Sequence, residues 1–584
     1  MKDVSCTLFA DTGAKQLMLL YLSQPVPELD AQYRLKSLSD GLYYQAPQKH
    51  LGDSFVKETG EAILILEGII ANGAKLLTDF ALPDLKALFT AAIQNEDILA
   101  KAHGQFFLIY YDKKSKTLKA YTNISSTVRL YYYWDGKELI LSDKIRQITN
   151  ALKAKGISYS ISELGARMTL SYGYMLEGFT TIKEVKQIPS ASVLCLQNGK
   201  CEVKRYFSWD FETRQIPEKE IYPRLTELFS QAVDCAFKRD EDRQHLAFLS
   251  GGLDSRVVVY SAHKLGYKGF ETLNFSEPGY LDHTIAQSIA RELKLKLNFF
   301  SLARGQYLLQ LPENLVYNEG QIVLHGAAHL FQGIKSLPIK NYGILHSGQI
   351  GDILKGSYLQ ARGHTPVNLV AAAYSTRILK SFASQIDRLR DCYPHHEAFV
   401  FYNRGLNAII NGDLASYQDS FSLSPFLEPL FVQYCLKLDP ALRQDSRLYL
   451  NWMKHSFAQA ARHKWEKTGA KASDPFLIVK LKYNLWRGSD KILRMFTKEP
   501  NRLNMIPFDY WWQINKDLKE HFEQERALLE ELKPLIDTEL YHETLLMSQS
   551  PIFSEKLQAY TLALSALYLM GKYDFNHLQR YDDE

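Results

Sequence analysis

Residues 246–260 read LAFLSGGLDSRVVVY, and this stretch decides how the chain folds. An apolar segment up to Leu249 precedes the glycine turn SGGLDS, which spans Ser250 to Ser255, and a helical pattern follows. Glycines let backbone N–H groups turn toward an anion, and the positive end of the following helix points at the same place. No Gly-Lys-Ser/Thr sequence follows, so the turn is not of the Walker type. The stretch predicts a site for nucleotide phosphates; the alternative is a glycine turn of an ordinary α/β sheet.

Asp254 stands inside this turn, where a carboxylate would hold the magnesium ion that accompanies ATP. Mg²⁺ prefers one or two carboxylates together with phosphate oxygens. We therefore expect ATP and Mg²⁺ as cofactors.

Helices and strands alternate on both sides of the glycine turn. Apolar residues four apart, from Leu281 to Leu293, mark one amphipathic helix. This βαβ alternation predicts a parallel sheet with helices on its faces. Beyond residue 360 the pattern is mainly helical. The other predicted helices are 223–237 and 256–265, and the predicted strands are 245–249, 271–275 and 297–302.

The first 150 residues are β-rich instead. AILILEGII, residues 62–70, is a strongly apolar strand, and residues 105–123 form a hairpin around a lysine-rich turn. Residues 131–143 form a second hairpin, for which Asp135-Gly136 is the predicted two-residue turn. The polar, non-periodic segment 207–220 places a domain boundary near residue 215.

The composition excludes several classes of protein. A chain of 584 residues with 46% hydrophobic and 23% charged residues is typical of a globular protein, and its length predicts two domains. A net charge of only +4 argues against a nucleic-acid partner. We expect neither a signal peptide nor a transmembrane segment. The six scattered cysteines favour a reducing cytoplasm over a disulfide scaffold or a zinc cluster.

Four segments carry a resemblance to a known family. SGGLDS resembles the pyrophosphatase loop of the ATP pyrophosphatases, which cleave ATP between its α and β phosphates. Within that superfamily the chain resembles asparagine synthetases and their relatives over roughly residues 1–480. The other three segments are EGFTTIKEVKQIPSASVLCLQNGK (177–200), LHSGQIGDILKGSY (345–358) and SPFLEPLFVQYCLKLD (424–439).

The resemblance implies a two-domain fold that combines α+β and α/β parts. Residues 1–215 would form an Ntn-hydrolase-like αββα domain, a degenerate glutamine amidotransferase. Residues 216–480 would form a parallel-sheet ATP pyrophosphatase domain. We expect residues 481–584 to be a helical extension packed on this synthetase domain.

The resemblance also implies a site for ATP and magnesium, residue by residue. Asp254 and Asp352 would bind the metal, and Lys467 would stabilise the pentavalent phosphorus and the pyrophosphate, a form of electrostatic catalysis. Lys464 and Lys471 are rivals for the role of Lys467. The residues implied to contact ATP are Leu249, Ser250, Gly251, Gly252, Asp254, Ser255, Ser347 and Gly348.

Asp282 opens the predicted amphipathic helix, where the family has an acidic residue near the pyrophosphate. A carboxylate at a helix N-terminus is also favoured by the helix dipole alone. Both interpretations stay open for this residue.

The N-terminal domain departs from the family at three positions. Family enzymes expose a catalytic cysteine when Met1 is removed, but residue 2 is Lys2, and Cys6 is better explained as a small apolar strand residue. Glu67 replaces an amide donor of the oxyanion hole, and losing one such donor costs roughly a hundred- to a thousand-fold in rate. His103 replaces the aspartate that holds the amine of glutamine. We predict that this half folds but does not hydrolyse glutamine.

The second ATP loop departs as well. In the family motif SGEGxDE the first glutamate is the general base for the attacking amine, and here Gln349 takes its place, while Ile353 replaces the last acid. A glutamine side chain cannot accept a proton at neutral pH. Adenylation of a carboxylate is less affected, because it needs only the metal and cations.

The leading hypothesis is an AMP-forming ligase that adenylates a carboxylate and transfers it to an amine. The acid would be a small molecule, a sugar uronic acid or a peptide acid, and the amine would be ammonia, ammonia from a partner protein, or an amine of the same substrate. A ligase that uses an amine of the same substrate would be an intramolecular cyclase, as β-lactam synthetases and lasso-peptide cyclases are. A second alternative is an ATP-binding pseudoenzyme or scaffold. A homodimer is left open.

Overall fold

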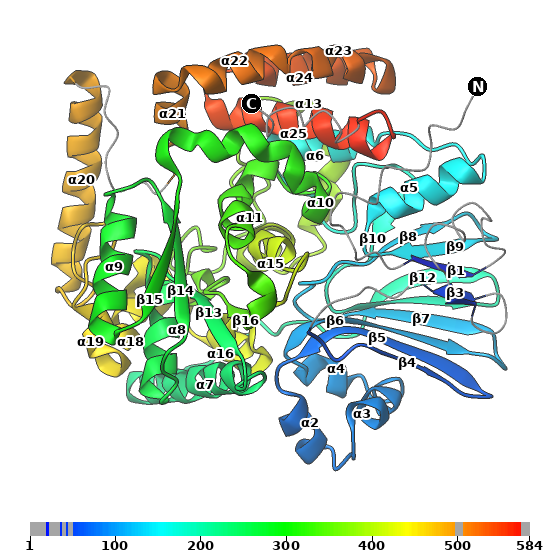
Figure 1. Cartoon of the computed structure of the whole chain (residues 1–584), viewed down its shortest axis with the longest axis horizontal. Coiled ribbons are helices and arrows are strands. Elements are labelled where there is room, and N and C mark those ends of the chain that lie inside the picture. The colour runs from blue at the N-terminus through cyan, green and yellow to red at the C-terminus, as the bar shows by residue number, and fades with distance from the viewer. Residues whose placement is uncertain (1–18, 23–35, 38–41, 45–50, 497–505, 574–584) are drawn as a thin grey trace.

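The computed structural model describes residues 19–22, 36–37, 42–44, 51–496 and 506–573. Two bodies of sheet lie side by side, and a layer of helices from the C-terminal part of the chain covers one side of both (Figure 1). No helix in these ranges is both long enough and apolar enough to cross a membrane.

The N-terminal body contains two six-stranded antiparallel sheets. Apolar side chains such as Ile65, Ile109, Leu141 and Leu194 fill the space between them. One sheet has the order β10-β8-β9-β1-β3-β2, with β1 Leu19–Leu22, β2 Lys36–Ser37, β3 Leu42–Tyr44, β8 Tyr131–Trp134, β9 Leu139–Ser142 and β10 Val185–Gln187. The other has the order β12-β11-β7-β6-β5-β4, with β4 Phe55–Glu58, β5 Ala62–Ile70, β6 Gly104–Asp112, β7 Thr117–Thr122, β11 Ser192–Gln197 and β12 Lys200–Arg205.

Helices cover the outer face of each sheet, so the layers stack as helix, sheet, sheet and helix. Residues such as Phe89 and Leu99 pack on one sheet, and Ile148 and Leu170 pack on the other. The helices are α2 Gly73–Asp79, α3 Leu85–Ala92, α4 Asp97–Lys101, α5 Ile145–Ala154 and α6 Glu163–Ser171.

The second predicted hairpin differs at its turn. β8 and β9 pair up to Trp134 and Leu139, so the loop has the residues 135–138 and not Asp135-Gly136 alone. Asp135 Oδ1 accepts hydrogen bonds from the N–H groups of Lys137 and Glu138, both at 2.8 Å. The prediction of a two-residue turn is wrong because the Asp135 side chain closes a longer, Asx-type turn.

The second body is a five-stranded sheet in which every pair is parallel. This confirms the predicted parallel-sheet domain. Its order is β15-β14-β13-β16-β17, with β13 Gln244–Phe248, β14 Glu271–Ser276, β15 Lys296–Ser301, β16 Tyr342–His346 and β17 Ser422–Leu423. α7 Glu218–Lys238 precedes β13, and the helices between the strands include α8 Leu253–Lys264, α9 Leu281–Leu293 and α11 Ala328–Lys335.

The direction of winding reverses between β13 and β16. Chain order runs outward from β13 through β14 to β15 on one side, and from β16 to β17 on the other. The loops that leave the carboxyl ends of β13 and β16 therefore diverge and leave a crevice, which is where α/β sheets bind ligands. Both loops with ATP-site resemblance, 250–255 and 347–351, begin at this point.

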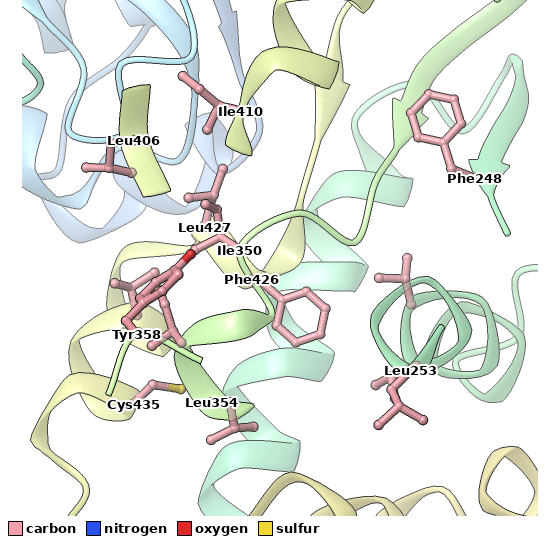
Figure 2. Close-up of a cluster of buried hydrophobic side chains, with 14 of the residues drawn as sticks. Phe248, Leu253, Ile350, Leu354, Tyr358, Leu406, Ile410, Phe426, Leu427 and Cys435 are labelled. Carbon is pink, nitrogen blue, oxygen red and sulfur yellow. The ribbon is translucent and has the colours of Figure 1, made fainter. Parts of the chain in front are cut away.

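Short helices fill the region after β16, and a buried apolar cluster lies beneath the two loops. In Figure 2, Ile350 and Leu354 lie with Leu427, Tyr358 and Cys435. The helical elements here are α12 Asp352–Lys355, α13 Leu379–Ile386, α14 His396–Val400, the π-helix η6 Phe401–Ile409, α15 Asn411–Ser416, α16 Pro429–Lys437, α17 Pro440–Arg443, α18 Arg447–Ser456, α19 Ala458–Ala461 and α20 Phe476–Phe496.

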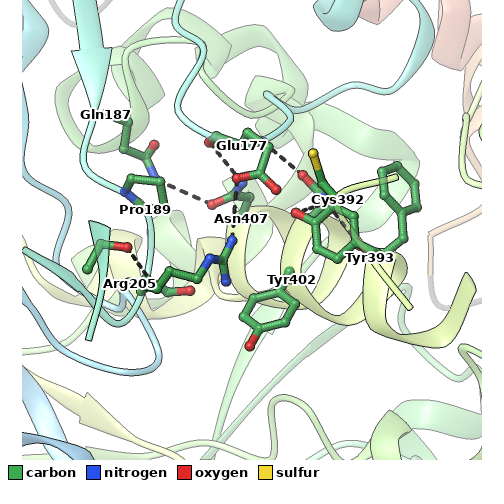
Figure 3. A network of polar contacts seen from close by, with 12 residues as sticks. Glu177, Gln187, Pro189, Arg205, Cys392, Tyr393, Tyr402 and Asn407 are labelled. Atoms are coloured by element: carbon green, nitrogen blue, oxygen red, sulfur yellow. Dashed lines mark hydrogen bonds and ion pairs between the residues drawn. The ribbon is translucent and has the colours of Figure 1, made fainter. Parts of the chain in front are cut away.

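The two bodies meet along η6 and β17. The Arg205 guanidinium lies 4.1 Å from the centre of the Tyr402 ring, and the Gln187 amide donates to Asn407 Oδ1 at 3.3 Å (Figure 3). The backbone N–H of Glu177 donates to Asn403 Oδ1 at 2.8 Å. Polar groups of the N-terminal body thus bind η6.

The C-terminal helices contact both bodies. α25 packs against α5 and α6, while α21 packs against the segment 303–314 that follows β15. Trp511 Nε1 donates to Glu277 at 2.8 Å, and Arg167 pairs with Glu543 at 2.8 Å. The contacts therefore extend beyond the synthetase domain on which we expected this extension to pack. The helices are α21 Phe508–Ile514, α22 Lys516–Gln524, α23 Ala527–Leu532, α24 Thr538–Ser548 and α25 Phe553–Leu569.

A buried ion pair fixes α12, which carries Asp352. Arg443 is fully buried and forms a two-bond pair with Glu397, which is 1% exposed. Arg443 Nη1 also donates to the carbonyl of Ile353 at 3.2 Å. A charge buried in this way is stable only while its partner is present.

We expect Arg443→Met to destabilise the protein by about 3–5 kcal/mol, because Glu397 would stay buried without its partner. The matched control is Arg224→Met. Arg224 pairs with Glu227 at 2.7 Å on the exposed side of α7, and such an exposed ion pair contributes about 0–1 kcal/mol to stability. Urea unfolding followed by tryptophan fluorescence measures both. Equal midpoints for the two variants would contradict the role of Arg443.

Candidate functional site

The glycine turn joins β13 to α8 and is held in shape by its own hydrogen bonds. Ser255 Oγ lies 2.9 Å from Ser250 Oγ and accepts from the Ser250 N–H at 3.0 Å. The Gly252 N–H donates to Ser250 Oγ at 3.1 Å, and the Gly251 N–H donates to Asp282 Oδ2 at 2.9 Å. These three N–H groups thus have partners within the protein, although the sequence pattern predicts that they face an anion.

The first turn of α8 supplies the remaining donors. Its N-cap residue is Gly252, and no side chain caps the helix. The N–H groups of Leu253, Asp254 and Ser255 have no acceptor within the helix, because the carbonyls four residues before them lie outside it. The helix dipole adds positive potential at the same point. This end of α8 can therefore bind an anion, with Asp254 beside it.

The second loop lies directly against the first. A Cβ at Gly348 would lie 2.7 Å from the Ser255 nitrogen and 3.0 Å from Asp254 Cβ, so only glycine fits. Ser347 is buried, and its Oγ donates to Asp413 Oδ1 at 3.5 Å. Leu249 is buried at the end of β13, where its N–H donates to the carbonyl of Leu273 at 2.9 Å. The fold thus brings together the segments that the resemblance assigns to ATP.

Asp254 and Asp352, the predicted magnesium ligands, share one cation of the protein itself. Lys355 Nζ lies 2.6 Å from Asp254 Oδ2 and 3.0 Å from Asp352 Oδ1. Ser357 Oγ donates to Asp352 Oδ1 at 2.9 Å. Burial lowers the pKa of Lys355, but the two carboxylates outweigh burial and raise it above its ordinary value. The two aspartates are suitable ligands for Mg²⁺ in kind, but an ammonium group holds the position between them.

Asp282 holds the glycine turn. It is 3% exposed and accepts from the Gly251 N–H and, at 2.8 Å, from the Asn274 amide. Burial, together with the nearby Glu466 carboxylate, raises the pKa of Asp282 to about 7. The side chain does more than complement a helix dipole; its place beside the pyrophosphate stays a prediction.

Arg256 ties a segment from the end of the synthetase domain to the glycine turn. Its side chain is fully buried, and Nη2 donates to the carbonyls of Gly251 at 2.8 Å and Lys464 at 2.6 Å. Nη1 donates to the carbonyls of Ala460 at 3.2 Å and His463 at 3.3 Å. The backbone of residues 460–464 is thereby fixed next to the glycine turn.

Lys467 follows this fixed segment. Its side chain is exposed, and Nζ lies 5.9 Å from the centre of the Trp465 ring. Its neighbour Glu466 packs against the glycine turn instead. The catalytic role of Lys467 stays a prediction, and the rivals Lys464 and Lys471 are exposed partners in an isolated β-bridge.

Of the altered positions of the second loop, Gln349 is half-buried and Ile353 is buried. The Gln349 amide packs on Gly412, whose Cβ would lie 2.1 Å from Gln349 Nε2, and Ile353 joins the apolar cluster. Asp413, which follows Gly412, accepts hydrogen bonds from the Ser422 and Ser347 hydroxyls. Burial raises the pKa of Asp413 to about 7, so this carboxyl near Gln349 can exchange a proton at neutral pH.

The altered glutaminase positions form structural contacts. Glu67 is 2% exposed and accepts from Ser54 Oγ at 2.7 Å. His103 Nε2 lies 3.2 Å from the carbonyl of Ser424, whose Oγ donates to the carbonyl of Gln349 at 2.7 Å. Burial lowers the pKa of His103 to about 4, so the imidazole is neutral. His103 thus links the N-terminal body, through Ser424, to the loop 347–351. Lys2 and Cys6 lie outside the described residues.

A parallel sheet with an uncapped helix start at its switch point is the arrangement in which α/β proteins commonly bind ligands. Residues 224–398 match the family model described as asparagine synthase. The chain is therefore asparagine synthetase-like, as the sequence analysis predicts, and the matched range includes both loops.

One curated relative is the putative asparagine synthetase (glutamine-hydrolyzing) 2 of Methanocaldococcus jannaschii, 24% identical over 210 residues. The match covers 35% of this chain and 40% of that relative's length.

Two solved structures also match. One is an allosteric regulatory enzyme of purine biosynthesis, with 8% identity over a match that covers 49% of this chain and 75% of that chain. The other is the glutamine phosphoribosylpyrophosphate amidotransferase from B. subtilis complexed with ADP and GMP, with 10% identity over a match that covers 50% of this chain and 86% of that chain. Both have a TM-score of 0.23, which is too low to inform the fold.

Sequence reasoning missed several charged residues of this site. Lys355 stands in the quoted segment 345–358, and its spacing of three from Asp352 on a helix was a usable signal. Arg256 follows the glycine turn directly, but a buried arginine cannot be told from an exposed one by sequence. Glu466 and Asp413 reach the site from distant parts of the chain, so no local pattern marks them.

We expect no glutaminase activity, because Lys2, Glu67 and His103 replace the nucleophile, the oxyanion donor and the substrate anchor. Labelled glutamine incubated with the protein, with and without ATP, should release no glutamate above the protein-free blank. Release that Cys6→Ala abolishes and Cys201→Ala preserves would contradict this expectation and would indicate a processed N-terminus.

Proposed function

We propose that this protein is an ATP-dependent, amide-forming ligase that adenylates a substrate carboxylate and releases AMP and pyrophosphate. The observation that carries the proposal is the contact between the two loops at the switch point. The uncapped first turn of α8 lies against Gly348, so a nucleotide there would meet both loops at once. The asparagine synthase match over residues 224–398 supports the same reaction class, and enzymes of this family use ATP.

The residues divide the work as follows. The first-turn N–H groups of α8 hold the β and γ phosphates, so that attack falls on the α phosphorus. Asp282 and Arg256 keep the glycine turn in its shape. Magnesium, usual for the family, would neutralise phosphate charge when bound, and Asp254 and Asp352 would hold it after Lys355 leaves the space between them. Lys467 completes the set as the predicted cation for the pentavalent centre.

The amine step lacks the family's base. Gln349 cannot take a proton, and its amide is packed against Gly412. The glutaminase half supplies no ammonia in this proposal, so the amine is free ammonia, ammonia from a partner, or an amine on the substrate itself. A sugar uronic acid or a natural-product or peptide acid is the proposed acceptor.

Carboxylate-dependent exchange between ATP and labelled pyrophosphate tests the proposal with a panel of uronic, peptide and amino acids. Exchange should appear with at least one acid and disappear in Gly348→Ala, because a methyl group would push the second loop off Ser255. Gly363→Ala is the matched control, since no atom lies within 4 Å of its added Cβ. Gln349→Ala should retain exchange because this residue belongs to the later step.

Lys467→Ala should lose exchange, and exchange that survives would move the cationic role to Lys464 or Lys471. Tight ATP binding without exchange for any acid would favour an ATP-binding pseudoenzyme. Release of ADP and phosphate in place of AMP and pyrophosphate would overturn the proposal.

A further inference from the structure

Lys355 occupies a place where a metal ion is expected. Its ammonium group lies 2.6 Å from Asp254 Oδ2 and 3.0 Å from Asp352 Oδ1, so the two carboxylates converge on one cation. We propose that Lys355 is a built-in counter-cation that keeps the nucleotide-free protein from binding a divalent metal at Asp254 and Asp352. The proposal concerns these three side chains and does not depend on the ligase reaction.

Three features hold Lys355 in this position. Asp352 and Lys355 are three residues apart on α12, so both side chains leave the same face of the helix. The Lys355 side chain is only 15% exposed, so most of it is enclosed by the protein. α12 ends at Gly356, where a Cβ would lie 2.7 Å from the carbonyl oxygen of Arg443, so the end of the helix is packed tightly. The contact is thus part of the fold and not a flexible surface pair.

Distance and charge both oppose a metal ion while Lys355 is in place. Mg²⁺ needs oxygen ligands at about 2.0–2.1 Å, and an ammonium group between the same oxygens leaves no room for it. Lys355 also reduces the charge of the pair from −2 to −1, which weakens the attraction for a divalent ion. The second oxygen of Asp254, Oδ1, is buried beside Gly351 and faces away from solvent.

Among the residues that the structure describes, His364, His395 and Glu397 form another group that could hold a metal ion. Some of its possible ligand atoms already have partners within the protein. His395 Nδ1 accepts from the Ala398 N–H at 3.2 Å, and both Glu397 oxygens bond to Arg443. Replacing His364 removes this group from a metal-binding measurement without touching the two loops.

The test is a titration of the nucleotide-free, full-length protein with Mn²⁺, with free Mn²⁺ measured by electron paramagnetic resonance. All proteins carry His364→Ala. The parent should bind Mn²⁺ too weakly to show a stoichiometric site. Lys355→Met should show one site and bind Mn²⁺ at least about tenfold more tightly than the parent, because the full −2 charge of the two carboxylates and the space between them become available. Adding Asp352→Asn to Lys355→Met should remove that site again.

Two controls separate the proposal from trivial outcomes. Lys335→Met removes an exposed lysine paired with Glu313 at 2.6 Å and should leave Mn²⁺ binding as in the parent. Circular dichroism should show that Lys355→Met is folded, and Lys355→Gln provides a second variant if it is not. One Mn²⁺ bound equally well by the parent and by Lys355→Met would overturn the proposal, as would a folded variant that gains no site.

Discussion

The close contact between two loops at the switch point of the parallel sheet is the constraint on which the rest of the site depends. β13 and β16 are neighbours, so the loops that leave them start side by side. Gly348 lets the second loop approach the Ser255 nitrogen without a side chain between them. Because of this approach, the positive end of α8 and both predicted metal ligands face one small volume. A larger residue at position 348 would separate the parts that must act together.

Buried charges keep this contact in place. Arg256 ties the segment 460–464 to the glycine turn, Asp282 holds the Gly251 N–H, and Arg443 fixes α12 through Glu397. Each of these groups carries a desolvation cost that only its partners offset. Such residues stabilise one specific arrangement of the backbone around the glycine turn and α12. A site predicted to bind phosphates depends on that arrangement more than on additional overall stability.

The sequence predicted the parts of this site that follow a local pattern. The alternation of strands and helices from residue 223 to residue 302 was enough for the parallel sheet, because hydrophobic periodicity and a glycine turn are both local. The second loop was found only through resemblance. The pairing of Lys355 with Asp254 could not be predicted, because it depends on strands that lie a hundred residues apart in sequence. The turn of the β8–β9 hairpin was missed because a single side chain determines it.

The altered N-terminal body still serves the site in a structural way. His103 contacts Ser424, which supports the second loop through Gln349, and Gln105 Oε1 accepts from the Ser422 N–H at 3.2 Å. Position 103, which the resemblance assigns to glutamine binding, thus contacts the second body. These contacts give the N-terminal body a structural role that does not depend on glutamine hydrolysis.

The central claim is that both loops bind one nucleotide together. Hydrogen–deuterium exchange of the full-length protein, with and without a non-hydrolysable ATP analogue and Mg²⁺, tests it most directly. The account predicts that amides of residues 250–256 and 347–356 gain protection together, over the same range of analogue concentration. Protection of one loop alone, or of neither loop while the analogue binds elsewhere, would contradict it.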